Sequence, residues 1–362
     1  MFELTNEQRK CFGLVAVCDH WERVVAKPSP YDRCKTCLYL DGNTVVKCIL
    51  CGEKRYCEYE LSEQLSDDRK YLLPKTAKGK PVLLSSATIL KRKPIGMVLT
   101  YDRTIVLHYN ANTDCAYYTN SYTEDGICDL NSFINWVQTW CDETTPADVE
   151  DVLSFSQQKR RHVRYQEGDV FRFKISRRLY GYGRILLDYG KMRKKKEPFW
   201  DVLMGKPLVC SAYHILTERD DVTIDELKAL PSLPSAILAD NTLYYGECQI
   251  IGNIPITDDE DYPIMYGSSI RCGEKAVCYQ CGKTHRKIEN VPALEYNRFQ
   301  NAGVSFRLNF KLPLLKQCIE AGSNTPYWEN YYEAKGDLRN PKHTEILQQV
   351  NAQFGFGTVS PP

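Results

Sequence analysis

Alternating apolar and polar positions dominate residues 61–128, and apolar positions at helical spacing follow directly after them. Strands are expected at 81–90, 96–102, 104–111 and 115–122, because each segment is rich in β-branched and aromatic residues and ends at Gly, Pro, Asn or Asp. Phe133, Ile134, Val137 and Trp140 recur three and four positions apart, which predicts an amphipathic helix. Thr145 and Pro146 then predict the start of a second helix, with proline at its first position. This part of the chain should be an antiparallel sheet with helices packed on it.

A second pattern, at residues 165–189, predicts a β-hairpin. Residues 170–175 are β-branched and aromatic, 176–183 are expected to turn the chain, and 184–189 form a second strand. Glycine and tyrosine alternate at 180–183, which suits a place where backbone approaches backbone while aromatic rings cover one face. We expect this hairpin to open a second domain.

The remaining segments predict an α+β domain with a mostly antiparallel sheet. Further strands are expected at 198–204, 209–216 and 243–251, a helix at 223–230, and two C-terminal helices at 313–322 and 341–355. A polar, basic stretch at 157–161 marks the expected boundary. The predicted fold class is therefore α+β, with a β-rich N-terminal domain at 1–160 and an α+β domain at 161–362.

Composition narrows the possible partners. With 43% hydrophobic and 26% charged residues over 362 positions, the chain is long and apolar enough for two globular cores. Lys and Arg number 47 and Asp and Glu number 46, so the formal net charge of +1 gives no reason to expect direct nucleic-acid binding. No run of eighteen apolar residues and no secretory signal pattern occur, so we expect a cytoplasmic protein that does not associate with membranes.

Two CxxC pairs suggest the one cofactor that the sequence predicts, a structural zinc ion. Cys34 and Cys37 precede a hairpin-like segment with Asp41-Gly42 at its tip, and Cys48 and Cys51 follow it. Tetrahedral zinc takes four thiolate or imidazole ligands, and a hairpin between two knuckles could fold all four thiols onto one ion.

Alternatives to zinc remain open at this point. The ten-residue gap between the pairs is short for a zinc ribbon, and Cys57 is a spare fifth thiol. The sixteen cysteines of a chain without a secretion signal are expected to stay reduced and to pack as small core residues, and redox chemistry is a third option. A further group, Cys272, Cys278, Cys281 and His285, is better explained by core packing than by a metal site.

Four motifs carry a resemblance to a known family. They are EGDVFRF at 167–173, YGYGRIL at 180–186, DYPIMYGSSI at 261–270 and DLRNP at 337–341. In this order and spacing they resemble the immunity protein 26 family of bacterial polymorphic-toxin systems, over roughly residues 163–355. The resemblance implies a protein that neutralises a cognate toxin protein by direct binding and occlusion. Residues 1–160 lie outside it.

The resemblance implies a binding surface and no catalytic residue. Exposed tyrosines are favoured anchors of protein interfaces. The candidate partner-binding residues are Tyr180, Tyr182, Tyr327, Tyr331 and Tyr332. The alternative function is a hydrolase of phosphotriester (organophosphate) substrates, because some sequences that resemble this family carry that description. The six histidines form no HxH or HExxH pair, so local motifs give this enzyme hypothesis no support.

Overall fold

The computed structural model describes residues 1–28, 34–74, 76–123, 125–194, 205–268, 276–295 and 304–356. The chain divides into two compact units, Met1–Arg161 and His162–Pro362, which are called unit 1 and unit 2 below. Helices and antiparallel sheets in both units confirm the predicted α+β class. Within the described ranges, no helix combines the length and the apolar character that crossing a membrane requires.

Unit 1 contains a seven-stranded antiparallel sheet, ordered β1-β2-β3-β4-β7-β8-β9. Its strands are β1 (Glu22–Val25), β2 (Lys35–Asp41), β3 (Thr44–Gly52), β4 (Arg55–Gln64), β7 (Ile95–Asp102), β8 (Ile105–Asn110) and β9 (Cys115–Thr119), and β5 (Tyr71–Leu72) pairs separately with β6 (Val82–Leu83). The predicted hairpin tip is confirmed, because Asp41 faces Thr44 across a two-residue turn in which Gly42 has φ +58°. A glycine suits this position because its backbone enters the left-handed region without a Cβ clash.

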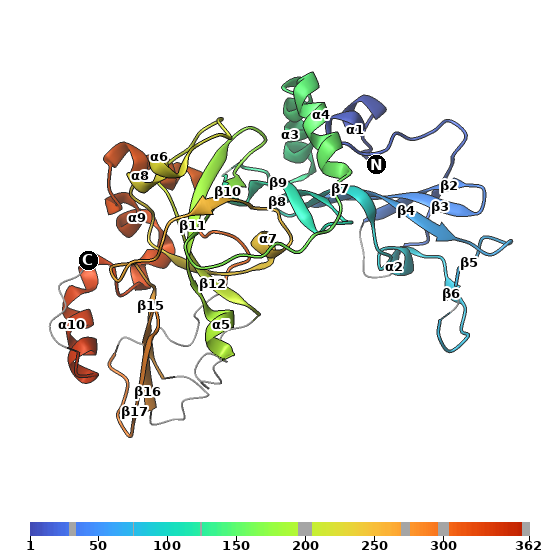
Figure 1. Cartoon of the computed structure of the whole chain (residues 1–362). Coiled ribbons are helices and arrows are strands. Elements are labelled where there is room, and N and C mark those ends of the chain that lie inside the picture. Colours follow the sequence, from blue (N-terminus) through green and yellow to red (C-terminus); the bar gives the residue numbers. More distant parts are fainter. Residues whose placement is uncertain are drawn as a thin grey trace. The chain divides into compact units, whose positions relative to one another are not determined.

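Each face of this sheet has its own apolar core. The helices of unit 1 are α1 (Asn6–Cys11), α2 (Ser86–Ile89), α3 (Leu130–Asp142) and α4 (Pro146–Ser156), with the short 3-10 turn η1 (Asn120–Tyr122). Phe12, Phe133 and Val152 place α1, α3 and α4 on one face, and Ile89 places α2 on the other (Figure 1). The predicted strand at 81–90 was wrong beyond Leu83, because Ser85 and the following residues close a capping box and begin α2.

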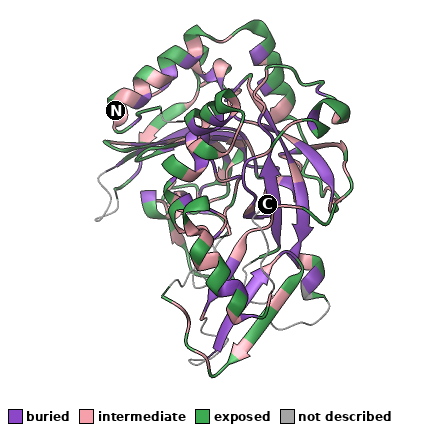
Figure 2. Ribbon diagram, turned by 90° about the vertical axis from the view of Figure 1, so that its left-hand side faces the viewer, coloured by how far each residue is buried: buried purple, intermediate pink, exposed green. Residues whose placement is uncertain are grey.

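Unit 2 contains two larger sheets. The five-stranded sheet runs β13-β12-β11-β10-β14, and the three-stranded sheet runs β15-β16-β17. Their strands are β10 (Asp169–Lys174), β11 (Tyr180–Asp188), β12 (Pro207–Ala212), β13 (Ala236–Ala239), β14 (Gln249–Asn253), β15 (Ile264–Gly267), β16 (Ala276–Cys281) and β17 (Thr284–Glu289). The central strands carry most of the buried positions, whereas exposed positions gather on the helices (Figure 2).

The β10–β11 hairpin confirms the role predicted for the alternating glycines. A Cβ at Gly181 would lie 2.6 Å from Phe173 Cζ, and one at Gly183 would lie 2.6 Å from Phe171 Cζ. Only glycine therefore leaves room for the two phenylalanine rings to lie across β11. The predicted turn was too long, because residues 180–183 already pair with β10 and the connection is shorter.

The helices of unit 2 are α5 (Tyr189–Arg193), α6 (Ile224–Lys228), α7 (Asn241–Tyr244), α8 (Leu312–Ala321), α9 (Thr325–Asn330) and α10 (Thr344–Gln353), with the 3-10 turns η4 (Tyr332–Gly336) and η5 (Pro341–His343). The predicted ends of α8 are confirmed, since Gly322 closes it in the left-handed region. The predicted strand at 243–251 was wrong, because α7 occupies its first part and only β14 is extended. The strand expected at 198–204 lies outside the described residues.

Candidate functional site

Two of the four motifs meet at one buried guanidinium. Arg339, from the DLRNP motif, donates from Nη1 to Asp261 Oδ2 at 2.7 Å and from Nη2 to Asp337 Oδ2 at 2.7 Å. Its Nε donates to Asp337 Oδ1 at 3.1 Å, and its Nη2 also donates to the Ser235 carbonyl oxygen at 2.8 Å. Asp261 opens the DYPIMYGSSI motif and accepts from the Ser235 backbone N–H at 2.7 Å. The guanidinium therefore joins three segments that are far apart in the sequence.

The electrostatics of this cluster favour a permanent ion pair. Burial alone would lower the pKa of Arg339, but Asp261 and Asp337 outweigh burial and raise it. The neighbouring Asn340 donates from Nδ2 to the carbonyl oxygens of Trp328 and Ala334, at 3.1 and 3.0 Å. The DLRNP motif thus fixes α9, η4 and the start of β15 around one point. The side chains of Arg339 and Asn340 donate hydrogen bonds that hold these segments together.

A second ion pair ties the hairpin motif to the same acidic turn. Arg184, from YGYGRIL, donates from Nη2 to Glu260 Oε1 at 2.5 Å and to the Pro255 carbonyl oxygen at 2.8 Å. Glu260 precedes Asp261, so adjacent carboxylates hold β11 and the DLRNP segment. Asp258 and Asp259, in the same acidic run, stay exposed. Three of the four motifs are therefore connected through one turn.

A known protein family matches part of this connected region. Residues 166–278 match the family model of Immunity protein 26. The match includes β10 to β14 and the Asp261 turn, and it confirms the resemblance over that segment. No curated protein and no solved structure matches the chain.

The five candidate tyrosines lie in unit 2 and differ in how far they are exposed. Tyr182, Tyr327 and Tyr331 are buried, with 0%, 6% and 5% of their surface exposed, so they cannot serve as surface anchors in this fold. Tyr180 is half-buried beneath Arg172, whose Cζ lies 4.7 Å from the ring centroid. Tyr332 is 69% exposed. Of the predicted partner-binding residues, only Tyr332 presents most of its side chain to solvent.

Sequence reasoning missed one exposed aromatic residue. Phe306 is 73% exposed and precedes α8 in a segment with no predicted element. Asn309 donates from Nδ2 to Glu333, which joins this segment to η4, where Tyr332 lies. Among the described residues of unit 2, Phe306 and Tyr332 are the two exposed large hydrophobic side chains. Nothing in the local sequence around Phe306 distinguished it from a core residue.

The four candidate zinc ligands do not converge on one point. All four cysteines are buried. Cys37 and Cys51 lie in the core on the face that carries α1, α3 and α4, whereas Cys48 lies in the core on the opposite face. Residues three apart on a strand point to opposite faces, so a CxxC pair inside a strand cannot form a knuckle. Cys34 instead packs against Gly52, where a Cβ would lie 2.5 Å from its Sγ.

Burial also makes the thiolate form of these cysteines costly. It raises the pKa of Cys37 to about 11 and that of Cys48 to about 12. The described arrangement does not fit a single tetrahedral zinc ion, and elemental analysis of the purified protein decides whether zinc is bound. In the second cysteine group, Cys278 is disulfide-bonded, so the expectation of reduced cysteines is wrong at this residue.

Three of the described histidines hydrogen-bond to the surrounding scaffold. His108 Nε2 lies 2.8 Å from the Phe12 carbonyl oxygen, and His214 Nε2 lies 2.9 Å from Asn324 Oδ1. His343 Nδ1 lies 2.9 Å from the Asp337 carbonyl oxygen. Across the described ranges, no three His, Cys, Asp or Glu side chains are grouped so that they could hold a metal ion.

Proposed function

We propose that the chain is an immunity protein that neutralises a cognate toxin protein by binding it directly and occluding it. The match of residues 166–278 to Immunity protein 26 carries this proposal. The matched segment holds a complete five-stranded sheet, so the similarity extends over a whole folding core and is more than one short motif. An inhibitor of this kind must meet the toxin where the toxin acts, and we infer that this place is the cytoplasm.

Unit 2 offers a surface suited to such binding. Stable protein interfaces bury about 1,200 Å² or more. A few aromatic or arginine anchors supply most of the binding energy. Tyr332 and Phe306 are exposed aromatic residues on segments joined by the Asn309–Glu333 hydrogen bond. We infer that they are anchors for the toxin.

Co-expression with the product of the adjacent gene tests the proposal. The chain should protect cells from that product, and the two proteins should co-purify as a complex. Protection without a complex would contradict neutralisation by binding, because occlusion requires a stable interface.

Variants of the two aromatic residues locate the surface. Loss of a hot-spot aromatic costs about 2 kcal/mol or more of binding free energy, or roughly thirtyfold in Kd. Tyr332→Ala and Phe306→Ala should each weaken the complex by about that amount. Leu153→Ala is the matched control, because Leu153 is a 44% exposed hydrophobic residue of α4 in unit 1. If all three variants bind the toxin with equal affinity, the toxin binds a surface that does not include Tyr332 and Phe306.

Phosphotriester turnover is the outcome that would replace this proposal. The purified chain should not hydrolyse phosphotriesters. Hydrolysis at an enzyme-like rate that is lost in a variant of His214 would favour the hydrolase hypothesis. His214 is the histidine to replace first, because burial lowers its pKa and its Nε2 lies 2.9 Å from Asn324 Oδ1, so its environment differs most from that of a solvated imidazole.

A further inference from the structure

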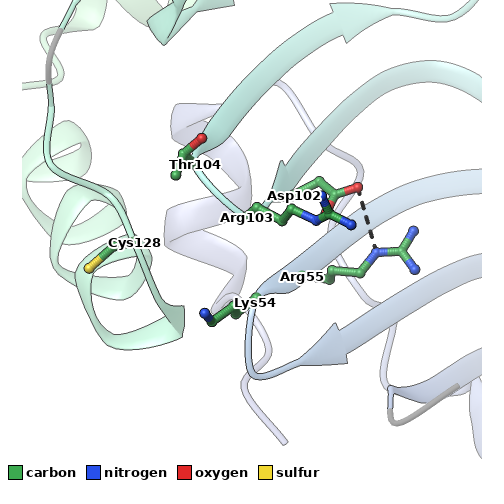
Figure 3. A pocket seen from close by; sticks show the side chains of 6 residues that line it. All are labelled: Lys54, Arg55, Asp102, Arg103, Thr104 and Cys128. Atoms are coloured by element: carbon green, nitrogen blue, oxygen red, sulfur yellow. Dashed lines mark ion pairs between the residues drawn. The ribbon is translucent and has the colours of Figure 1, made fainter.

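Unit 1, which lies outside the family match, has a pocket of about 570 Å³ at the ends of interior strands of its sheet. It is lined by Lys54, Arg55, Asp102, Arg103, Thr104 and Cys128. Figure 3 shows that these side chains come from two hairpin turns and from the segment that precedes α3. Positions 54, 103 and 128 are distant in the sequence, so the fold alone assembles this group.

Backbone hydrogen bonds hold the three segments together. The Arg103 N–H donates to the Lys54 carbonyl oxygen at 2.7 Å, which joins the β3–β4 turn to the β7–β8 turn. The Leu130 N–H donates to the Glu53 carbonyl oxygen at 2.9 Å, which brings the start of α3 to the same place. The cationic side chains of the pocket therefore project from a fixed base.

The pocket carries more positive than negative charge. Arg55 Nε lies 3.8 Å from Asp102 Oδ2, so one of the three cations has a carboxylate beside it. Among the described residues, Lys54 and Arg103 have no carboxylate within 4.0 Å of their charged nitrogens. Asp129, which follows Cys128, accepts from the Ser132 N–H as the cap of α3. Bonds from Ser132, together with a smaller effect of Lys54, lower the pKa of Asp129, so it stays ionised and offsets part of the surplus.

Arg103 occupies a backbone position that is unfavourable for its residue type. Its φ is +60°, in the left-handed region where glycine or asparagine is preferred. A residue with a Cβ is strained at such a position, and strained backbone is found often at functional sites. An arginine at position 103 therefore makes this turn less stable than a glycine would, and it adds a positive charge to the pocket.

We propose that this pocket binds a small phosphate ester. A phosphate monoester carries a charge of about −1.5 to −2 near neutral pH, which balances the two cations that lack a carboxylate. The six lining residues are exposed, so the pocket is open to solvent and leaves room for an organic group beside the phosphate. A nucleic acid would need an extended basic surface, and the chain's formal net charge is only +1. This binding is independent of the toxin proposal.

Calorimetric titration with pyrophosphate and with glycerol 3-phosphate tests the site. The double variant Lys54→Gln with Arg103→Gly removes both unpaired cations, and the glycine also relieves the left-handed backbone. Because a hydrogen bond to a charged group contributes about 1.5–3 kcal/mol, the variant should bind both probes at least about tenfold more weakly. Lys78→Gln with Lys80→Gln is the matched control, since it removes two exposed cations of unit 1 outside the pocket. Its affinity should equal that of the original chain.

Cys128 supplies a second readout that needs no variant. It is an exposed free thiol in the pocket lining. Saturating glycerol 3-phosphate should slow its alkylation by iodoacetamide, measured by mass spectrometry, and should leave the rate at Cys18 unchanged. The proposal is overturned if neither probe protects Cys128, if the control pair loses as much affinity as the pocket pair, or if citrate or a single-stranded oligonucleotide binds more tightly than the phosphate esters.

Discussion

Both units bury a charged cluster in which one ion meets two of the opposite sign, but the signs are reversed. In unit 1, Glu58 Oε1 accepts from Arg9 Nε at 2.6 Å and from Lys47 Nζ at 2.9 Å. In unit 2, the single cation Arg339 meets Asp261 and Asp337, both at 2.7 Å. Among these three groups of each cluster, one charge is in surplus, positive in unit 1 and negative in unit 2.

The two surplus charges have different surroundings. The side chains of Lys47 and Glu58 are both 0% exposed, whereas Asp261 is 36% exposed and can share its charge with water. Arg9 also leaves Nη2 buried without a hydrogen-bond partner, whereas Nε, Nη1 and Nη2 of Arg339 all donate. Uncompensated buried charge is costly. The cluster of unit 1 should therefore depend more strongly on its one carboxylate.

Glu58→Gln should have the largest effect, because it leaves Arg9 and Lys47 buried without a counter-charge. Removal of one partner of a buried ion pair costs about 3–5 kcal/mol. Native-state hydrogen exchange of peptides from β3 and β4 measures the loss in unit 1. The control Glu22→Gln removes an exposed partner of Arg69 and should cost less than about 1 kcal/mol. Equal losses in the two variants would refute the charge-balance account.

Arg339→Met should have the next largest effect, confined to unit 2. It leaves two carboxylates without their cation, but Asp261 is partly hydrated, so the loss should be near 3 kcal/mol, the lower end for buried pairs. Hydrogen exchange of β15 measures it. Arg219→Met is the matched control, because Arg219 is 56% exposed and also pairs with two carboxylates. A loss from Arg219→Met as large as that from Arg339→Met would show that the number of ion pairs matters more than burial.

Acid should remove part of the contribution of Glu58. Burial alone would raise the pKa of Glu58, but Lys47 and Arg9 outweigh burial and lower it below 4.5. A carboxylate with a lowered folded-state pKa stabilises the fold above its unfolded pKa, and this stability is lost as the pH falls through the folded pKa. The stability difference between the original chain and Glu58→Gln should be constant near neutral pH and should narrow below pH 4.5. Urea titrations from pH 7 to pH 3 measure this difference, and a gap that widens in acid would contradict the assignment.

Local elements of both units could be predicted because their signals are local. The stripe that includes Phe133 and Val137 does face a core, and α4 begins at Pro146 directly after its cap Thr145. Each signal spans a few residues, so no tertiary information is needed to interpret it. The four motifs were recognised in the same way, from short segments in order.

Properties that depend on which face is covered could not be predicted. Alternation places Tyr180 and Tyr182 on one face of the strand and the glycines between them on the other face. Only the packed fold decides that Tyr182 is buried. The two-residue spacing within each CxxC pair is the spacing of a zinc knuckle. However, β3 extends through both Cys48 and Cys51, so their thiols point to opposite faces of the sheet. The pocket at Lys54 and Arg103 depends on two turns that meet only through sheet pairing.

Lys47→Met should have the smallest effect and is the sharpest test of the comparison. It removes the surplus cation, and Arg9 still donates to Glu58 at 2.6 Å, so the remaining pair is balanced. Glu60, which faces Lys47 across the strands, is partly exposed, so water can solvate its carboxylate when the cation is removed. Buried ion pairs replaced by apolar residues often leave stability unchanged or improved. We expect a change within about 1 kcal/mol, in the range for such replacements.

The double variant Lys47→Met with Glu58→Gln completes this test. It leaves one orphaned cation, Arg9, whereas Glu58→Gln alone leaves two. The double variant should therefore be more stable than Glu58→Gln alone, and this non-additivity is the mark of direct coupling between the two side chains. Hydrogen exchange of β3 and β4 compares the variants under one condition. If Lys47→Met costs as much as Glu58→Gln, the lysine is an essential partner of the carboxylate and the positive charge in unit 1 is not in surplus.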